Sequence, residues 1–150
     1  MKSLLIVGAG GHGQVVKEIA QALGYERIDF IDDSNSHAIG KIKDLENFKE
    51  YLNAFVGIGN NKLRNKLIDL LERLGYQVPV LIHPTAYISR SALIEAGTVV
   101  EPQAIVNAHT KIKKGSIISV GAIIDHDVTL GKCVHINAGA IVEVGGKVKD

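Results

Sequence analysis

The sequence has little of several residue types that define common protein classes. It has one cysteine, Cys133, no tryptophan and three prolines, so an internal disulfide is excluded and a reducing compartment is expected. Its opening apolar run, residues 4–7, is too short for a signal peptide or a transmembrane span. The 17 basic residues nearly balance the 16 acidic ones, and no basic strip indicates nucleic acid or a membrane surface. These absences predict a cytoplasmic globular protein.

Residues 82–148 contain a strict six-residue repeat. The first position of every six is aliphatic, and the fifth is nearly always small. This period predicts short strands joined by turns, with aliphatic side chains stacked inside and small residues where the chain bends. Such repeats resemble the left-handed parallel β-helix, whose chains form homotrimers, so we expect residues 82–150 to be that domain. The aliphatic positions are Ile82, Ile88, Ile94, Val100, Val106, Ile112, Ile118, Ile124, Leu130, Ile136, Val142 and Val148.

The first part of the chain, residues 1–81, alternates strand-like and helix-like segments. Two longer helices are predicted to end at Gly24 and Gly75, and a short helix is expected around Leu45. Strands that alternate with helices favour a small α/β domain with a Rossmann-like parallel sheet. Its predicted strands are residues 2–7, 28–31, 54–58 and 77–81.

A glycine motif lies between the first predicted strand and the first predicted helix. It reads Gly8-Ala9-Gly10-Gly11-His12-Gly13 and fits the G-x-G-x-x-G pattern. Glycines let a phosphate approach the backbone, and a helix N-terminus offers unpaired N–H groups. The motif therefore predicts binding of a nucleotide diphosphate, and a purely structural tight turn is the alternative. A nicotinamide dinucleotide normally requires more parallel strands than this domain supplies.

Polar residues follow two further predicted strands. Asp32 and Asp33 end the second strand, where they either accept hydrogen bonds from a ribose or base or solvate the strand end. Gly59, Asn60 and Asn61 end the third, where the asparagines either cap the next helix or contact a ligand. In open α/β sheets, ligands lie at the carboxyl ends of strands, so these residues join the glycine motif as candidate substrate contacts.

Four segments together point to a known family: residues 7–13, residues 30–33, residues 57–61 together with Arg64, and residues 124–127. On these segments the chain resembles the nucleotide-sugar acetyltransferases of the bacillosamine and sialic-acid O-acetyltransferase family, and the resemblance covers essentially all 150 residues. It implies that the N-terminal domain holds a UDP-type sugar and that the β-helix binds acetyl-CoA as acetyl donor, without a metal.

His126 stands between Asp125 and Asp127 in a turn of the repeat that we expect to face outward. Acetyl transfer from a thioester to an amine or hydroxyl requires a base, and histidine titrates near neutral pH. A carboxylate on one ring nitrogen fixes the tautomer and stabilises the imidazolium. His126 and Asp127 match the family's catalytic base and its acidic partner, although residues alone also allow a surface histidine between two solvated acids.

The resemblance also implies contacts with acetyl-CoA. His135 corresponds to a histidine that reaches the thioester from a subunit interface. Ser119 stands where a close relative carries asparagine, and Val144 stands where relatives often carry glycine. A backbone N–H near Val144 remains available to the thioester oxygen. His12 is expected to contact the sugar nucleotide or to cap its turn, whereas His83, before Pro84, is expected to be structural.

Several alternatives remain open from the sequence. Members of the family continue beyond the position of Asp150 with further coils, which supply much of the acetyl-CoA groove. We therefore expect this chain to be a fragment of a longer enzyme or a naturally short form. A non-catalytic nucleotide-sugar binding module and a sugar O-acetyltransferase are therefore alternatives to an enzyme that acetylates a UDP-linked 4-amino-6-deoxy sugar. A metalloenzyme of the carbonic-anhydrase type would use histidines across a trimer interface as zinc ligands, with His109, His126 and His135 as the candidates. A nicotinamide oxidoreductase has only the glycine motif in its favour.

Overall fold

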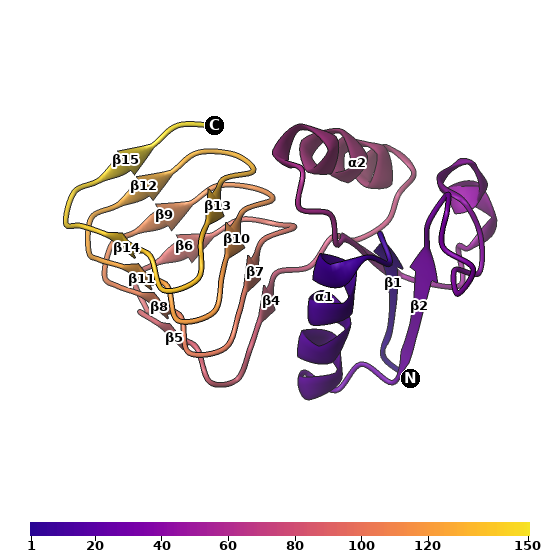
Figure 1. Ribbon diagram of the computed structural model, residues 1–150, viewed down its shortest axis with the longest axis horizontal. Coiled ribbons are helices and arrows are strands. Elements are labelled where there is room, and N and C mark those ends of the chain that lie inside the picture. Colours follow the sequence, from indigo (N-terminus) through magenta and orange to yellow (C-terminus); the bar gives the residue numbers. More distant parts are fainter. The chain divides into compact units, whose positions relative to one another are not determined.

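The computed structural model describes all residues, 1–150, and divides them into two units, Met1–Pro79 and Val80–Asp150 (Figure 1). The division falls two residues before the boundary expected from the repeat. Leu81 already belongs to the second unit, because it pairs with Val99 as part of the first coil. No helix of the protein is long and apolar enough to cross a membrane.

The first unit is built on a parallel sheet of three strands in the order β2-β1-β3. They are β1 (Ser3–Val7), β2 (Arg27–Ile31) and β3 (Asn53–Val56). Val7 pairs with Ile31 on one side and with Val56 on the other, so all three strands end at the same edge of the sheet. The central strand β1 is a continuous apolar run buried from Leu4 to Val7, which is typical of a parallel sheet covered on both faces.

Two α-helices and one 3-10 helix connect these strands: α1 (Gly11–Ala22), η1 (Ile42–Asn47) and α2 (Asn61–Arg73). Each α-helix buries one apolar stripe, for example Leu67, Ile68 and Leu71 of α2. Gly24 (φ +89°) and Gly75 (φ +91°) adopt the left-handed conformation just past the two α-helices. Their positions confirm the two predicted helix ends, because this conformation is easily reached only without a Cβ.

Two predictions for this unit were wrong in detail. Residues 77–81 do not form a fourth strand of the sheet; Gln77 makes only an isolated parallel bridge with Asn53. Pro79 lies within this run and has no N–H to donate, and Leu81 pairs instead within the second unit. The short helix is a 3-10 helix that ends at Asn47 and does not continue towards Leu52.

The second unit consists of two-residue parallel strands that form three four-stranded sheets, which the chain visits in turn (Figure 1). Each strand from β4 to β12 pairs with the strand 18 residues further along, as Ile117 pairs with His135. The strands are β4 (Leu81–Ile82), β5 (Tyr87–Ile88), β6 (Leu93–Ile94), β7 (Val99–Val100), β8 (Ile105–Val106), β9 (Lys111–Ile112), β10 (Ile117–Ile118), β11 (Ile123–Ile124), β12 (Thr129–Leu130), β13 (His135–Ile136), β14 (Ile141–Val142) and β15 (Lys147–Val148).

The repeated aliphatic residue is the second residue of every strand, and it forms the core of this unit. Val100, Ile112, Ile118, Ile124 and Leu130 are fully buried. Small residues at the fifth position of each six, such as Ala104 and Ala122, are buried in the same cluster. Burying such an aliphatic side chain contributes roughly 1.5–3 kcal/mol. The hydrophobic period therefore predicts which side of each strand faces inward.

The turns between strands share one backbone conformation from residue 95 onward. Their third residue has a left-handed φ, which glycine adopts without steric cost. Four of these positions carry other residues: Gln103, His109, Asp127 and Cys133, with φ between 52° and 61°. Asp127 (φ +58°) is one of them, so this aspartate adopts a backbone conformation that glycine reaches more easily.

Gly13 brings the start of α1 against the end of β1. A Cβ on Gly13 would lie 1.9 Å from the Gly8 carbonyl oxygen, whereas a Cβ on Gly11 would meet nothing within 4 Å. We predict that Gly13→Ala destabilises the first unit by about 2–3 kcal/mol, because backbone must move apart. Gly11→Ala, the matched control, should change stability by no more than about 1 kcal/mol. Amide hydrogen exchange of β1 measures both, and equal protection in the two variants would contradict the packing role of Gly13.

Candidate active site

The glycines of the first unit fall into two groups. Gly8, Gly13 and Gly57 are packed together, since a Cβ on Gly57 would lie 2.9 Å from the Gly13 Cα atom. By contrast, a Cβ on Gly10 or Gly11 would meet no atom within 4 Å. The packing of the chain explains the first group and leaves open space beside the second. The strand-to-helix turn that opens α1 is therefore accessible.

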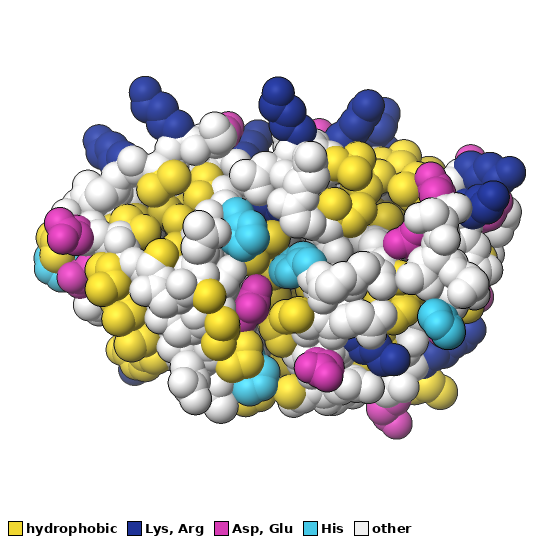
Figure 2. Space-filling view, in the orientation of Figure 1, with side chains coloured by type: hydrophobic (Ala, Val, Ile, Leu, Met, Phe, Trp, Pro, Cys, Tyr) yellow, Lys and Arg dark blue, Asp and Glu magenta, His cyan; other side chains and the backbone are white.

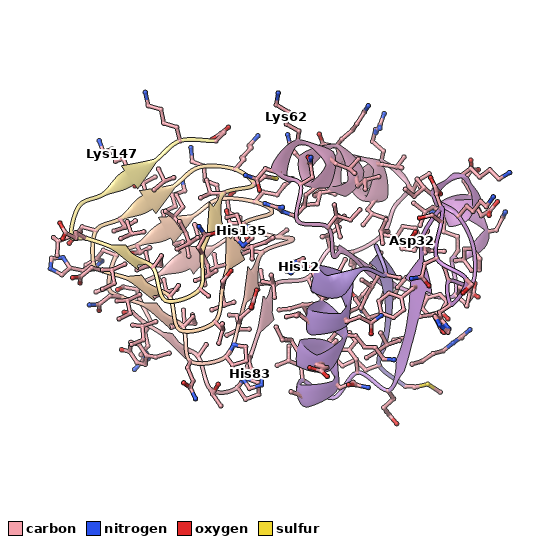
Figure 3. All side chains as sticks on the ribbon, in the orientation of Figure 1. His12, Asp32, Lys62, His83, His135 and Lys147 are labelled. Carbon is pink, nitrogen blue, oxygen red and sulfur yellow. The ribbon has the colours of Figure 1, made fainter.

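Asp32 ties this turn to the end of β2 (Figure 3). One carboxylate oxygen, Oδ2, accepts the Ala9 N–H at 2.8 Å, and Oδ1 accepts from the backbone N–H groups of Ser34 and Asn35 and from the Ser34 hydroxyl. The hydrogen bond from Ala9, followed by those from Ser34 and Asn35, lowers the pKa of Asp32 below its ordinary value. Both oxygens of Asp32 are thus engaged by the chain itself, which gives Asp32 a structural role in shaping the turn.

Asp33 has a different set of contacts. Its Oδ1 accepts the backbone N–H of Ile42 at 2.9 Å, at the start of η1. The side chain also lines a surface hollow of about 510 Å³ with Lys41, Ile42 and Lys43. Both acidic residues line a neighbouring hollow with residues of the 34–41 segment, but Asp33 is the more exposed of the two.

Asn60, Asn61 and Arg64 organise the turn after β3. Asn60 caps α2, because its Oδ1 accepts the Leu63 N–H at 2.9 Å. Arg64 is 1% exposed; it donates to the Asn61 side-chain oxygen and to the backbone carbonyls of Ile58 and Gly59 at 2.8–3.1 Å. Gly59 itself has open space where a Cβ would lie. The capping role predicted for Asn60 is present, and Asn61 is held by a buried guanidinium.

His12 follows the two open glycines as the second residue of α1. Its side chain is half-buried, and the Nε2 atom is buried. The Gly10–Gly13 turn, Asp32 and the turn after β3 all lie at the carboxyl edge of the sheet, where each preceding strand ends. The structure therefore brings the predicted residues of the first unit to one edge, at the position where open parallel sheets bind ligands.

In the second unit, the His126 Nδ1 atom lies 2.6 Å from Asp127 Oδ2. Both side chains are about half exposed, at 47% and 58%. A carboxylate can only accept, so Nδ1 carries the proton of this hydrogen bond, and in the neutral form of the imidazole Nε2 is then the proton acceptor. The pair has the composition and the geometry of a general base with an orienting acid.

The His126 corner comprises the turns after β5, β8, β11 and β14, residues 89–92, 107–110, 125–128 and 143–146. Within it, the Gly145 N–H donates to the His126 carbonyl at 3.1 Å, which places the 143–146 turn next to His126. Val144 is 54% exposed there. Its own N–H takes part in no hydrogen bond within the chain and remains available as a donor.

Ser119 and His135 form a second pair. Ser119 Oγ lies 3.0 Å from His135 Nε2, and Ser119 is 7% exposed whereas His135, on β13, is exposed (Figure 3). Ser119 belongs to the Ser119 corner, the turns after β4, β7, β10 and β13, whereas His126 follows β11. Within one chain, the two pairs therefore lie at opposite ends of the strands of one sheet, β5-β8-β11-β14. Ser119 lies in the turn before β11, and His126 lies in the turn after it.

Three supporting residues were not singled out from the sequence. Asn107 and Thr110 bind the 125–128 turn from the coil below. Glu101 is buried at the Ser119 corner, and this burial raises its pKa although a hydrogen bond from the Val120 N–H acts in the opposite direction. The period places these residues one coil below His126 and Ser119, but polarity alone does not reveal their partners.

No group of three or more His, Cys, Asp and Glu side chains forms a metal-ligand set within the chain, and His109, His126 and His135 do not converge within one chain.

Comparison with known proteins connects both units to one family. Residues 3–71 match the family model of the PglD N-terminal domain. UDP-N-acetylbacillosamine N-acetyltransferase of Bacillus subtilis is 33% identical over 120 residues, which are 67% of this chain and 51% of that protein. This chain therefore spans about half the length of that curated relative.

Two solved structures are similar over nearly the whole chain. The acetyltransferase domain of PglB from Neisseria gonorrhoeae, in complex with acetyl coenzyme A, is 35% identical with a TM-score of 0.90; the match covers 99% of this chain and 85% of that one. A mutant of GDP-perosamine N-acetyl transferase from Caulobacter crescentus, in complex with CoA and GDP-perosamine, is 29% identical with a TM-score of 0.94. This match covers 98% of this chain and 74% of that one. The chain belongs to this family of nucleotide-sugar N-acetyltransferases.

The contacts of Asp32 predict a pH dependence of stability. Because its pKa is lowered in the folded state, the unfolded chain binds the proton more readily, and the stabilisation is present above about pH 4 and lost as the pH falls further. Asp32→Asn should reduce the free energy of unfolding by about 0.5–1.5 kcal/mol near neutral pH, because solvent screens this partly exposed carboxylate, and the difference should shrink below about pH 4.

Denaturant unfolding from pH 3 to pH 7 measures this difference. Asp69→Asn, a change at an exposed position on α2, is the matched control and should show no such trend. A difference between wild type and Asp32→Asn that does not vary with pH would contradict the structural role of the carboxylate.

Proposed function

We propose that this chain is an acetyl-CoA-dependent N-acetyltransferase that acts on the amino group of a UDP-linked 4-amino-6-deoxy sugar. The observation that carries the proposal is the 2.6 Å contact between His126 Nδ1 and Asp127 Oδ2 in an exposed turn. Family membership supports the reaction class, since the relatives named above are N-acetyltransferases or were solved with CoA or acetyl-CoA.

His126 acts as the general base in this proposal. Its Nε2 removes a proton from the sugar amine as the nitrogen attacks the thioester carbonyl. A C–N bond forms, the C–S bond breaks, and the proton passes from Nε2 to the leaving CoA thiolate. Asp127 holds the imidazole in the required tautomer and stabilises the imidazolium. The N–H of Val144, next to His126, is the proposed donor to the thioester oxygen as negative charge develops.

The electrostatics of the His126 corner favour an amine over a hydroxyl as acceptor. Asp125 and Asp127 flank His126 in sequence, and Glu143 occupies the position of Asp125 one coil above. These carboxylates attract the amino group of the sugar in its ammonium form, which loses one proton to solvent before His126 removes the second during attack. A sugar hydroxyl, the acceptor of a sialic-acid-type O-acetyltransferase, gains nothing from them.

The first unit, residues 1–81 in the sequence division, is proposed to hold the nucleotide sugar. The open space beside Gly10 and Gly11 lets a diphosphate approach the N-terminus of α1, whose N–H groups and dipole favour anions. His12, Asp33 and the Gly59-Asn60-Asn61 turn lie at the same edge as further contacts. Asp32 and Arg64 hold these turns in place through hydrogen bonds to their backbone groups. The proposal names uridine because the curated relative uses a UDP sugar.

The second unit is proposed to be a left-handed parallel β-helix that assembles as a homotrimer. Hydrophobic side chains are exposed over β5, β8 and β11 (Figure 2), and they form a column with β14. The column is Tyr87, Ile105, Ile123 and Ile141, which are 37–64% exposed. A contiguous apolar strip of this kind marks an interaction surface.

The same sheet separates the two polar pairs, which supports a shared site. His126 borders it on one side and Ser119 with His135 on the other. In a closed ring, copies pack head to tail through this face, so the His126 corner of one copy meets the Ser119 corner of the next. His135 and Ser119 of a neighbouring copy would then contact the acetyl donor bound beside His126.

His126→Ala should lower kcat/KM for acetyl transfer by roughly 10²–10⁴-fold, because the general base is lost. Asp127→Asn should lower it less, by roughly 10-fold or more, since the amide tolerates the left-handed backbone but disturbs the tautomer. The matched control is His109→Asn, at a turn position with φ +58°, and it should leave transfer unchanged. CoA release with a UDP-linked 4-amino sugar measures all three variants. Full activity of His126→Ala would refute the role assigned to the base.

Ile123→Glu should convert the trimer to monomers, because it buries three like charges at the proposed interface. Leu93→Glu is the matched control: Leu93 is 64% exposed but lies on the sheet with Lys111, Thr129 and Lys147, outside the apolar column. Sedimentation velocity distinguishes the two outcomes. A trimer that survives Ile123→Glu, or one that dissociates equally with Leu93→Glu, argues against this interface.

A further inference from the structure

The turn that carries His126 and Asp127 is fixed at both ends by one buried hydroxyl. Thr110, in the turn one coil below, is 1% exposed. Its Oγ1 donates to the carbonyl of Asp125 at 2.7 Å and accepts the N–H of Val128 at 3.2 Å. Asp125 and Val128 are the first and last residues of the 125–128 turn, so Thr110 sets the distance between the two ends.

Other contacts from the same coil act on the interior of the turn. Asn107 Nδ2 donates at 3.2 Å to Asp125 Oδ1, which also accepts the backbone N–H of His126 at 2.8 Å. The Asp127 N–H donates to the carbonyl of Ala108 at 2.9 Å. The side chains of His126 and Asp127 are themselves about half exposed, so their relative orientation depends on the backbone that these contacts hold.

We infer that Thr110 is a positioning residue for the His126–Asp127 pair: its hydroxyl holds the turn in the conformation that brings Nδ1 of His126 onto the Asp127 carboxylate. The inference rests on the proposed function where it concerns catalysis, but the positioning itself concerns this chain alone. Thr110 has no part in binding substrate, since its hydroxyl is buried and both of its contacts are with backbone groups. Loss of the hydroxyl leaves Asp125 and Val128 without this partner and lets the left-handed Asp127 relax.

Thr98 is a control that the fold itself provides. It is fully buried, donates to the carbonyl of Lys113 at 3.3 Å and accepts the N–H of Ser116 at 3.2 Å. Thr98 therefore makes for the 113–116 turn the same two contacts that Thr110 makes for the 125–128 turn. The 113–116 turn contains neither His126 nor Asp127, so a purely structural effect of hydroxyl loss appears in Thr98→Val as well.

The first experiment compares transfer kinetics of Thr110→Val, Thr110→Ser and Thr98→Val. Thr110→Val should lower kcat by roughly 10–100-fold with little change in KM for the sugar nucleotide, because misplaced catalytic groups cost turnover rather than binding. Thr110→Ser should restore kcat to within about threefold of wild type, since it keeps the hydroxyl. Thr98→Val should stay within the same range. Equal losses in Thr110→Val and Thr98→Val, or no rescue by serine, would overturn the inference.

The second experiment is independent of catalysis. Nitrogen-15 NMR of the His126 ring reports which nitrogen carries the proton at a fixed pH. Wild type, Thr110→Ser and Thr98→Val should show the Nδ1-bound proton and its resonance in the hydrogen bond to Asp127. Thr110→Val should show a mixture of tautomers with that resonance lost. An unchanged spectrum in Thr110→Val would overturn the inference. Absence of acetyl transfer in wild type would overturn the proposed function, but the NMR comparison would still decide whether Thr110 positions the His126–Asp127 pair.

Discussion

Parallel pairing of strands that lie 18 positions apart, held by backbone hydrogen bonds between successive coils, is the constraint on which the second unit depends. Each strand has only two residues, so a single strand forms too few bonds to persist alone and requires the coils above and below it. The same register aligns the turns into corners, with Ala108, His126 and Val144 at successive levels. The relation of His126 to its neighbours is therefore inherited from main-chain pairing rather than from contacts of its own side chain.

The first unit solves a different problem with glycine. Gly8, Gly13 and Gly57 allow the end of β1, the start of α1 and the turn after β3 to approach closely. The side chains of Asp32 and Arg64 hydrogen-bond to neighbouring backbone groups and so hold these turns in shape. Gly10, Gly11 and Gly59 leave open space beside the same turns. Each of these short motifs therefore contains both residues that fix the carboxyl edge of the sheet and glycines that leave space there for a ligand.

Much of this fold is predictable because its determinants are local or periodic. The six-residue period identifies the inward side of each strand of the coils, and Gly24 and Gly75 mark helix ends by their freedom to adopt positive φ. The error at residues 77–81 has the same origin, since an apolar run looks alike whether it extends a sheet or begins a coil. The His126–Asp127 contact joins adjacent residues and is visible in the sequence, although the catalytic roles assigned to the predicted site residues stay predictions.

What the sequence does not reveal is how polar groups far apart in the chain satisfy one another. Asp32 reads equally as a ribose acceptor or a strand-end residue until the Ala9 N–H, 23 positions earlier, is placed on it. Thr110 reads as one of several small residues at the fifth position of the repeat. Its two contacts lie 15 and 18 residues away, and only the coil geometry makes them simultaneous.

The measurement that tests the central claim most directly is the chemical identity of the product formed in a single turnover. Carbon-13-labelled acetyl-CoA and a nitrogen-15-labelled UDP-4-amino-6-deoxy sugar would be mixed with the protein and followed by NMR. The account predicts a labelled amide, seen as a carbon-nitrogen coupling, together with one equivalent of free CoA. A labelled ester on a sugar hydroxyl, or a bound sugar nucleotide that stays unacetylated, would contradict it.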